Sequence, residues 1–288
     1  MDSVLLSFVV GLAYVLAGIA VFVFGSSYFQ LFRVNVSSAY RAVLPLLCVA
    51  ALLLVLRFGE NESLHLLALG FVAASIANLG GWAVAWLHRP LGIRDDSMKG
   101  LALGKALEAV AVVLLILLVL ITARTRPEAV YLALGNVPLG LALGLGGFAL
   151  FAVLSWFQAQ SSGIPTSILA RSLPWILLFA FANAFMEELW LRALFLGPLV
   201  SLVGSIAAVL LTSAVFTLMH IGVTYMSKDE RIRFLVILFP LGVAWGFCLH
   251  YTGSIIASTL FHAGADLMII NGFLAAFHSQ QEAETSSG

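Results

Sequence analysis

The sequence MEELWLRALF, at residues 186–195, places two adjacent carboxylates, Glu187 and Glu188, and the guanidinium of Arg192 inside a long apolar run. Between Arg171 and Lys228 the chain has no other Asp, Glu, Lys or Arg. A charge at the centre of a membrane helix costs about 2.5–3.5 kcal/mol on insertion scales, so three unpaired charges would cost roughly 8–10 kcal/mol. We therefore expect these three side chains to be paired, hydrated or functional.

Two histidine motifs follow in later apolar runs: FTLMH, which ends at His220, and HAGAD, which contains His262 and Asp266. Residues four apart share one face of a helix, so His262 and Asp266 should project together, whereas Glu187 should point about 100° away from Glu188. Three helices could thus direct carboxylates, imidazoles and a cation at one pocket. These groups suit general acid–base chemistry, in which a base activates water, donors hold an oxyanion and a cation orients the acids.

Each motif also has a structural interpretation. The acidic motif could be a helix end with a satisfied ion pair, and a lone membrane histidine is often a hydrogen bond between helices. His262 and Asp266 could form a structural polar pair. Asn183, one turn before Glu187, could line the same pocket or only bond across helices. The occurrence of all three motifs within about eighty residues favours a shared catalytic site.

The composition places these motifs in a membrane protein. The 288 residues are 62% hydrophobic and only 10% charged, whereas a soluble domain has about 25% charged residues. The formal net charge is zero, and without a basic patch there is no support for nucleic-acid binding. The two cysteines, Cys48 and Cys248, lie in apolar stretches and read as buried hydrophobes. Spanning segments must be helical because hydrocarbon offers the backbone no other partner, so the predicted fold is an all-α, polytopic bundle.

Apolar runs long enough to span a bilayer predict nine transmembrane helices, with eight as the alternative count because the second and eighth runs are the weakest. They lie at residues 4–24, 40–56, 64–87, 103–121, 138–157, 174–197, 205–221, 233–250 and 254–276. A polar connection near 158–172 separates the first five helices from the rest. We therefore predict an N-terminal membrane bundle at 1–157, catalytic helices at 172–276 and a polar tail at 277–288.

The residues EELWLR, FTLMH and HAGAD resemble the motifs EExxxR, FxxxH and HxxxN/D of the CPBP family of intramembrane proteases, which includes the CAAX prenyl proteases and the bacteriocin-processing Abi proteins. The resemblance covers about residues 174–271 and implies hydrolysis of peptide bonds at or within the membrane. It implies that Glu187 activates water together with His220. It further implies that His262 and the residue at position 266 support the oxyanion.

The resemblance gives Glu188 and Arg192 a supporting role beside the reacting groups. At position 266, prenyl-protease members usually carry Asn, whereas this chain has Asp266. An ionised aspartate cannot donate a hydrogen bond to an oxyanion, so Asp266 would have to be protonated or to orient His262. This departure weakens the specific prenyl-protein interpretation and leaves the family assignment in place.

Metal dependence is open at this point. Glu187, His220 and His262 would form a His₂Glu set of the kind that catalytic zinc uses, although the chain contains no HExxH motif. The family has been described both as metalloproteases and as glutamate-type proteases. We favour the metal-free type, with zinc as the alternative, because adjacent acids beside an arginine already offer two different environments without an ion.

The favoured function is an intramembrane endopeptidase that acts on membrane-associated, and in one version prenylated, proteins or peptides. Its expected partners are that substrate and the lipid bilayer, and its expected location is the cell membrane, as an integral multi-pass protein. The alternative is a non-catalytic scaffold or bacteriocin-immunity protein with the same fold. A transporter is less favoured because the ionisable residues cluster in one half of the chain and do not recur in two related halves.

Overall fold

The computed structural model describes residues 3–25, 38–94, 96–222 and 228–286. These residues form helices joined by short connections, and no strand occurs among them, so the predicted all-α fold is confirmed. In chain order the elements are α1 Ser3–Gly18, η1 Ile19–Phe24, α2 Ser38–Phe58, α3 Glu62–His88, α4 Met98–Thr122, η2 Pro127–Val130, α5 Val137–Ser161, α6 Thr166–Glu187, η3 Glu188–Ala193, α7 Leu194–Val203, α8 Ser205–Met219, η4 His220–Gly222, α9 Lys228–Thr252 and α10 Ile255–Ser286.

Nine segments of the described chain are long and apolar enough to cross a membrane, which agrees with the predicted count. The chain is therefore a multi-pass membrane protein. The sixth segment is the longest, at 38 residues from Thr166 to Val203, because α6, η3 and α7 follow one another without a break. Large apolar side chains such as Leu53, Leu54 and Leu150 are exposed on the outer helices. This surface suits a hydrocarbon solvent, in which an exposed leucine costs nothing.

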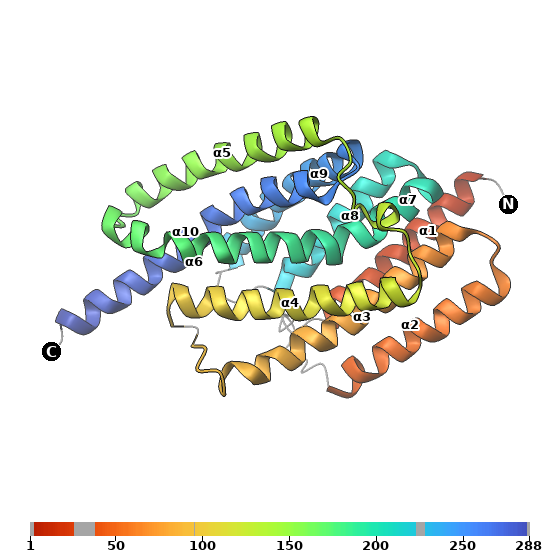
Figure 1. Cartoon of the computed structure of the whole chain (residues 1–288), viewed down its shortest axis with the longest axis horizontal. Helices are drawn as coiled ribbons and strands as arrows, with labels where there is room; N and C mark the ends of the chain where they lie inside the picture. The colour runs from red at the N-terminus through yellow and green to blue at the C-terminus, as the bar shows by residue number, and fades with distance from the viewer. Residues whose placement is uncertain (1–2, 26–37, 95, 223–227, 287–288) are drawn as a thin grey trace.

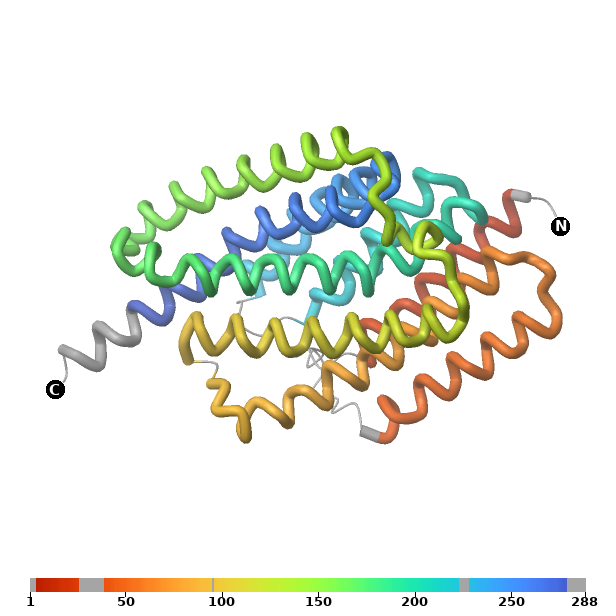
Figure 2. Tube along the Cα trace, viewed as in Figure 1, coloured from red at the N-terminus to blue at the C-terminus, as the bar shows by residue number. Residues whose placement is uncertain are grey.

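The helices run lengthwise, with the two chain ends at opposite ends of the molecule (Figure 1). α5 lies along one edge of this view and α2 along the opposite edge (Figure 2). α10 packs against α5, α6 and α9, while α4 packs against both α3 and α6. Helices on either side of residue 157 are thus in direct contact, and the division into two membrane units stays a prediction.

Local sequence signals explain where several helices begin. The Asn61 side chain accepts hydrogen bonds from the backbone N–H groups of Ser63 and Leu64 and caps α3. Ser97 caps α4 and Asn136 caps α5 in the same way. Such caps satisfy N–H groups that the first helical turn leaves without a partner. Between α7 and α8 the chain turns at Gly204, whose φ of +85° favours glycine.

Glycines allow α5 and α10 to touch backbone to backbone. A Cβ atom at Gly264 of α10 would lie 2.6 Å from the Cα of Phe148, and one at Gly147 of α5 would lie 2.4 Å from the Phe261 ring. Gly147 thus lies at the close contact with α10, whereas Gly146 has nothing within 4 Å of its Cβ position. Close approach of this kind fixes α10, which carries HAGAD, against its neighbour.

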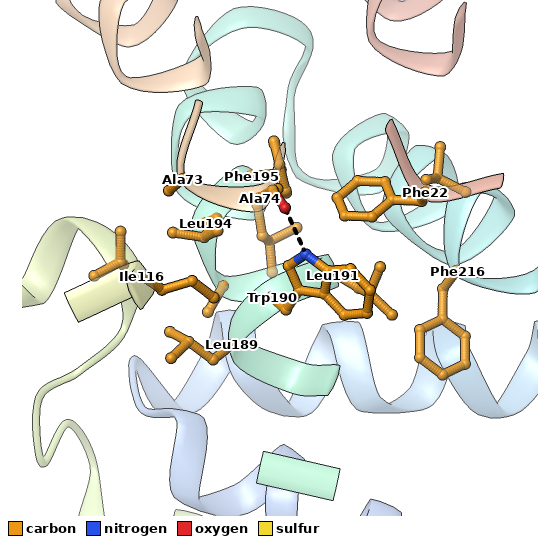
Figure 3. Close-up of a cluster of buried hydrophobic side chains, with 14 of the residues drawn as sticks. Phe22, Ala73, Ala74, Ile116, Leu189, Trp190, Leu191, Leu194, Phe195 and Phe216 are labelled. Carbon is orange, nitrogen blue, oxygen red and sulfur yellow. Dashed lines mark hydrogen bonds between the residues drawn. The ribbon is translucent and has the colours of Figure 1, made fainter. Parts of the chain in front are cut away.

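A buried apolar core surrounds the turn that follows the two glutamates (Figure 3). Leu189, Trp190 and Leu191 of η3 are almost completely buried among side chains that include Phe22 of η1. The Trp190 indole donates a hydrogen bond of 3.2 Å to the backbone carbonyl of Ala74 in α3. The EELWLR segment is therefore anchored from outside its own helix by the N-terminal part of the chain.

Candidate active site

The three predicted motifs converge on one cavity of about 590 Å³. Glu187 reaches it from the end of α6, His220 from the end of α8, and His262 with Asp266 from α10. Glu188 and Arg192 lie behind this lining and are completely buried. All six predicted site residues thus belong to one cluster, although they come from segments up to about eighty residues apart.

The acidic motif has a local geometry that differs from the expected α-helix. α6 ends at Glu187, and Glu188–Ala193 form a π-helical turn. A π turn contains one extra residue per turn and is often found at functional sites. Glu188 nevertheless pairs with Arg192, whose guanidinium donates to the carboxylate in a fully buried ion pair. The extra residue widens the turn without breaking the pairing that the spacing predicted.

The first glutamate faces the two imidazoles. Glu187 Oε2 lies 3.9 Å from His220 Nε2 and 3.7 Å from His262 Nε2. Both distances exceed a direct hydrogen bond, and among the described residues this oxygen has no hydrogen-bond partner. A polar separation of this size is where a bridging water is expected. The two glutamates therefore differ: Glu188 is tied to Arg192, while Glu187 presents an oxygen to the cavity.

The hydrogen bonds of the two histidines orient their rings. His220 Nδ1 lies 2.9 Å from the Phe216 carbonyl oxygen, and His262 Nδ1 lies 2.9 Å from Glu188 Oε1. Because a carbonyl or carboxylate oxygen only accepts, both Nδ1 atoms carry the proton. Each ring consequently turns its Nε2 atom toward Glu187. As a neutral imidazole it offers a lone pair there, and as an imidazolium it offers an N–H group.

Aromatic side chains pack against the His262 ring and the Arg192 guanidinium. Trp245 of α9 stacks on His262 with ring centroids 3.9 Å apart and planes 8° apart. The Arg192 guanidinium lies over the Phe216 ring, 4.9 Å from its centroid, and 5.7 Å from the centroid of Trp245. The motif residue Phe216 is thus a packing surface for the buried arginine. Nothing in the spacing of the motifs pointed to Trp245, because it lies in α9, which carries none of the three motifs.

Asp266 is held by a residue whose role the sequence left open. Asn183 Nδ2 donates a hydrogen bond of 3.0 Å to Asp266 Oδ2. The other oxygen of Asp266 lies 3.6 Å from His262 Nε2. Asn183 also lines the cavity. It therefore does both things that the sequence suggested: it lines the pocket and it bonds α6 to α10.

The N-terminal helices supply part of the cavity wall. Val84 of α3 and Leu101 of α4 line it together with the ion pair of Lys105 and Glu108, whose charged atoms lie 2.7 Å apart. Apolar side chains form most of the remaining wall, among them Phe151 and Phe179. Sequence reasoning did not assign these residues to the site because they lie far from the motifs along the chain.

The His₂Glu set is slightly too wide for zinc as it stands. Two ligands of a tetrahedral zinc are about 3.3–3.4 Å apart, since Zn–N and Zn–O bonds are about 2.0–2.1 Å long. Glu187 Oε2 is 3.7 and 3.9 Å from the two Nε2 atoms. Within the part of the chain that the structure describes, no group of three or more His, Cys, Asp or Glu side chains has the arrangement of a metal site. Metal dependence therefore stays a prediction.

Residues 169–268 match the model of the type II CAAX prenyl endopeptidase Rce1-like family. No curated protein and no solved structure matches the chain. The matched stretch contains all six predicted site residues and Asn183. The resemblance to the CAAX prenyl proteases, predicted from three short motifs, is therefore confirmed over residues 169–268, where this membrane protein carries an Rce1-like domain.

Proposed function

We propose that this chain is an intramembrane endopeptidase of the glutamate type, in which Glu187 activates water. The observation that carries the proposal is the position of Glu187 Oε2, which faces two imidazole nitrogens at 3.7 and 3.9 Å in a largely apolar cavity. The family match supports peptide-bond hydrolysis in a membrane. The assignment of individual steps to individual residues is our proposal.

In the proposed first step, a water molecule between Glu187 and His220 loses a proton to the carboxylate. The water oxygen then bonds to the carbonyl carbon of the scissile peptide, and the electron pair of the C=O bond moves to oxygen. His220 holds the water through Nε2, because its Nδ1 proton is committed to the Phe216 carbonyl. A positioned general base of this kind contributes about 10²–10⁴ in rate.

In the proposed second step, the tetrahedral intermediate collapses. The C–N bond breaks, and Glu187 returns its proton to the leaving amine nitrogen. His262, as an imidazolium, donates a hydrogen bond from Nε2 to the oxyanion and keeps its proton. Its Nδ1 atom lies 2.9 Å from Glu188 Oε1, which accepts the other hydrogen bond. Asp266 Oδ1 lies 3.6 Å from the same Nε2 atom. Preorganised donors aimed at the developing charge supply much of the rate of such reactions.

The structural pair behind this site keeps its geometry fixed. Glu188 and Arg192 are both completely buried, and the carboxylate bonds to Arg192 and His262 at once. An arginine in this position neutralises Glu188 and so stops the second carboxylate from competing for the catalytic proton. We therefore assign Glu188 and Arg192 to positioning and Glu187 to chemistry.

The proposed substrate is a membrane-associated protein or peptide, with a prenylated CAAX sequence as the first candidate. The apolar walls formed by Leu101, Phe151 and Phe179 suit aliphatic side chains or a prenyl chain. The family description names prenylated CAAX proteins as the substrate class. We also propose that the protein lies in the cell membrane.

The test is cleavage of a fluorescence-quenched peptide ending in a prenylated CAAX sequence, by the purified full chain in detergent micelles. Wild type should release the C-terminal peptide, and Glu187→Gln should not, with mass spectrometry locating the cut. A matched peptide without the prenyl group tests the substrate assignment. No cleavage of either peptide by folded wild type, or equal cleavage by Glu187→Gln, would contradict the proposal.

A further inference from the structure

Asp266 stands where the CAAX prenyl proteases usually carry Asn, whose amide can donate hydrogen bonds. An ionised carboxylate has only acceptor oxygens. One of these oxygens accepts from Asn183, and the other lies 3.6 Å from His262 Nε2. Asp266 therefore suits the task of holding neighbours in place better than that of stabilising negative charge on the substrate.

Asn183 has the donor that Asp266 lacks. Its side-chain amide carries two N–H groups, and one of them donates to Asp266 Oδ2 at 3.0 Å. The residue is only 8% exposed and lines the cavity. It lies four positions before Glu187 in α6, so both side chains project from the same helix face. The amide is thus held by Asp266 on the helix face that also carries the proposed base.

A comparison with a second buried asparagine shows that more than cross-helix bonding is involved. Asn271 of α10 is 3% exposed, and its amide nitrogen donates to both the backbone carbonyl and the hydroxyl of Ser155, each at 2.7 Å. Asn271 does not line the cavity. Both of its N–H groups are therefore used to tie α10 to α5. For Asn183, Asp266 is the single acceptor within the described part of the chain.

We propose that Asn183 is an oxyanion donor of this enzyme. One N–H group is fixed by Asp266, and the other donates to the carbonyl oxygen of the scissile peptide as that oxygen gains negative charge. No proton is transferred by Asn183; it supplies a hydrogen bond that strengthens in the transition state. Asp266 acts as the residue that orients the amide. The inference deepens the proposed function and rests on it.

The experiment compares Asn183→Leu with Asn271→Leu in the full chain, using the quenched prenylated peptide. Loss of one oxyanion donor typically lowers kcat by about 10²–10³. We expect a fall of that size for Asn183→Leu, with KM changed by no more than a few-fold. Asn271→Leu should lower the unfolding temperature and leave kcat per folded molecule near the wild-type value. Asn183→Ala serves as the second variant if the leucine does not fit.

The affinity for an inhibitor that resembles the intermediate gives a second measurement. A purely structural role of Asn183 would leave this affinity unchanged. A peptidyl phosphinate carries a tetrahedral, negatively charged P–O group, which resembles the intermediate and not the planar substrate. Its inhibition constant should rise in the Asn183 variants in proportion to the loss of kcat/KM. A normal kcat in folded Asn183→Leu and Asn183→Ala, or an unchanged phosphinate affinity, overturns the inference.

The two levels of the proposal fail differently. If folded wild type does not cleave the peptide, the proposed function itself is wrong. If wild type cleaves the peptide and needs Glu187 while the Asn183 variants keep normal kcat and phosphinate affinity, only the role of Asn183 is wrong.

Discussion

The indole of Trp245 lies flat on the imidazole of His262, with ring centroids 3.9 Å apart and an angle of 8° between the planes. His262 is also hydrogen-bonded through Nδ1 to Glu188. The imidazole is therefore fixed both in its plane and along its hydrogen-bonding direction. A ring held in this way meets an oxyanion without having to reorganise.

Removal of the stacking partner should lower catalysis more than stability. We expect Trp245→Leu to reduce kcat by about ten-fold or more, because a misplaced catalytic group can cost up to 10² in rate. Trp245→Phe keeps a flat ring beside His262 and should retain most of the activity. The measurement is kcat for both variants beside their thermal unfolding in detergent. Equal kcat for the leucine and phenylalanine variants would show that stacking does not position His262.

The two adjacent glutamates should separate activity from stability. Glu187→Gln removes the proposed base while keeping its shape, so cleavage should fall by about 10²–10⁴ with little change in the unfolding temperature. Glu188→Gln should lower the unfolding temperature as well as the activity, because it leaves the buried Arg192 without its carboxylate. Thermal unfolding and cleavage are measured on the same preparations. The assignment is wrong if the glutamine at 187 destabilises the protein as much as the one at 188.

Truncation of the buried arginine should destabilise the protein strongly. Glu188 and Arg192 are both completely buried, and removing one partner of a buried ion pair typically costs about 3–5 kcal/mol. We expect Arg192→Leu to unfold at a markedly lower temperature than wild type. Arg171→Leu, at an exposed position of α6, is the matched control and should unfold near the wild-type temperature. Equal unfolding temperatures for the two variants would show that the buried pair is not needed for stability.

Cleavage should not depend on an added metal if water is activated by Glu187 alone. Dialysis against EDTA or 1,10-phenanthroline at neutral pH should then leave cleavage unchanged. This expectation follows from the separations of 3.7 and 3.9 Å between the donor atoms, which are wider than those of a zinc site. Loss of cleavage that zinc restores would favour the His₂Glu alternative, and binding of zinc to wild type but not to His220→Ala would identify its ligands.

Two neighbouring glycines of α5 offer a matched test of helix packing. Gly147 touches the Phe261 ring of α10, whereas Gly146 has nothing within 4 Å of its Cβ position. Gly147→Val should push α5 away from α10 and lower both the unfolding temperature and cleavage, since overpacking typically costs about 1–3 kcal/mol. Gly146→Val should behave like wild type. If both variants unfold at the same temperature, the close approach does not stabilise α10.

Hydropathy was sufficient to predict the membrane-spanning helices, and the spacing of the motif residues was sufficient to predict that the three motifs face one cavity. A long apolar run must be helical in hydrocarbon because its backbone has no other hydrogen-bond partners, and residues four apart on a helix share a face. The ion pair of Glu188 and Arg192 follows from these two rules. The π turn that contains the pair does not, because the residue pattern of a short π turn is indistinguishable from that of an α-helix. Its presence depends on how η3 packs against α3, α4, α8 and α10.

The site also contains residues whose side chains carry no signal in the sequence. Trp245 reaches His262 only because α9 packs against α8 and α10. Lys105 and Glu108 line the cavity because α4 packs on α6. Each of these contacts joins residues far apart in the chain, and such contacts are decided by how the helices cross. The sequence could therefore indicate the reacting groups more readily than the walls around them.

The cavity wall has consequences for how such an enzyme could diverge. The proposed reacting side chains all lie within residues 169–268, while α3 and α4, which precede that stretch, contribute Val84, Leu101 and Lys105 to the wall of the cavity. Mutations in these two helices can reshape the chamber without touching an acid or an imidazole. Substitutions in residues 62–122 could thus change which substrates are bound during evolution, while the proposed catalytic residues stay the same. Cleavage by chimaeras that exchange only α3 and α4 between relatives would show which substrates those two helices select.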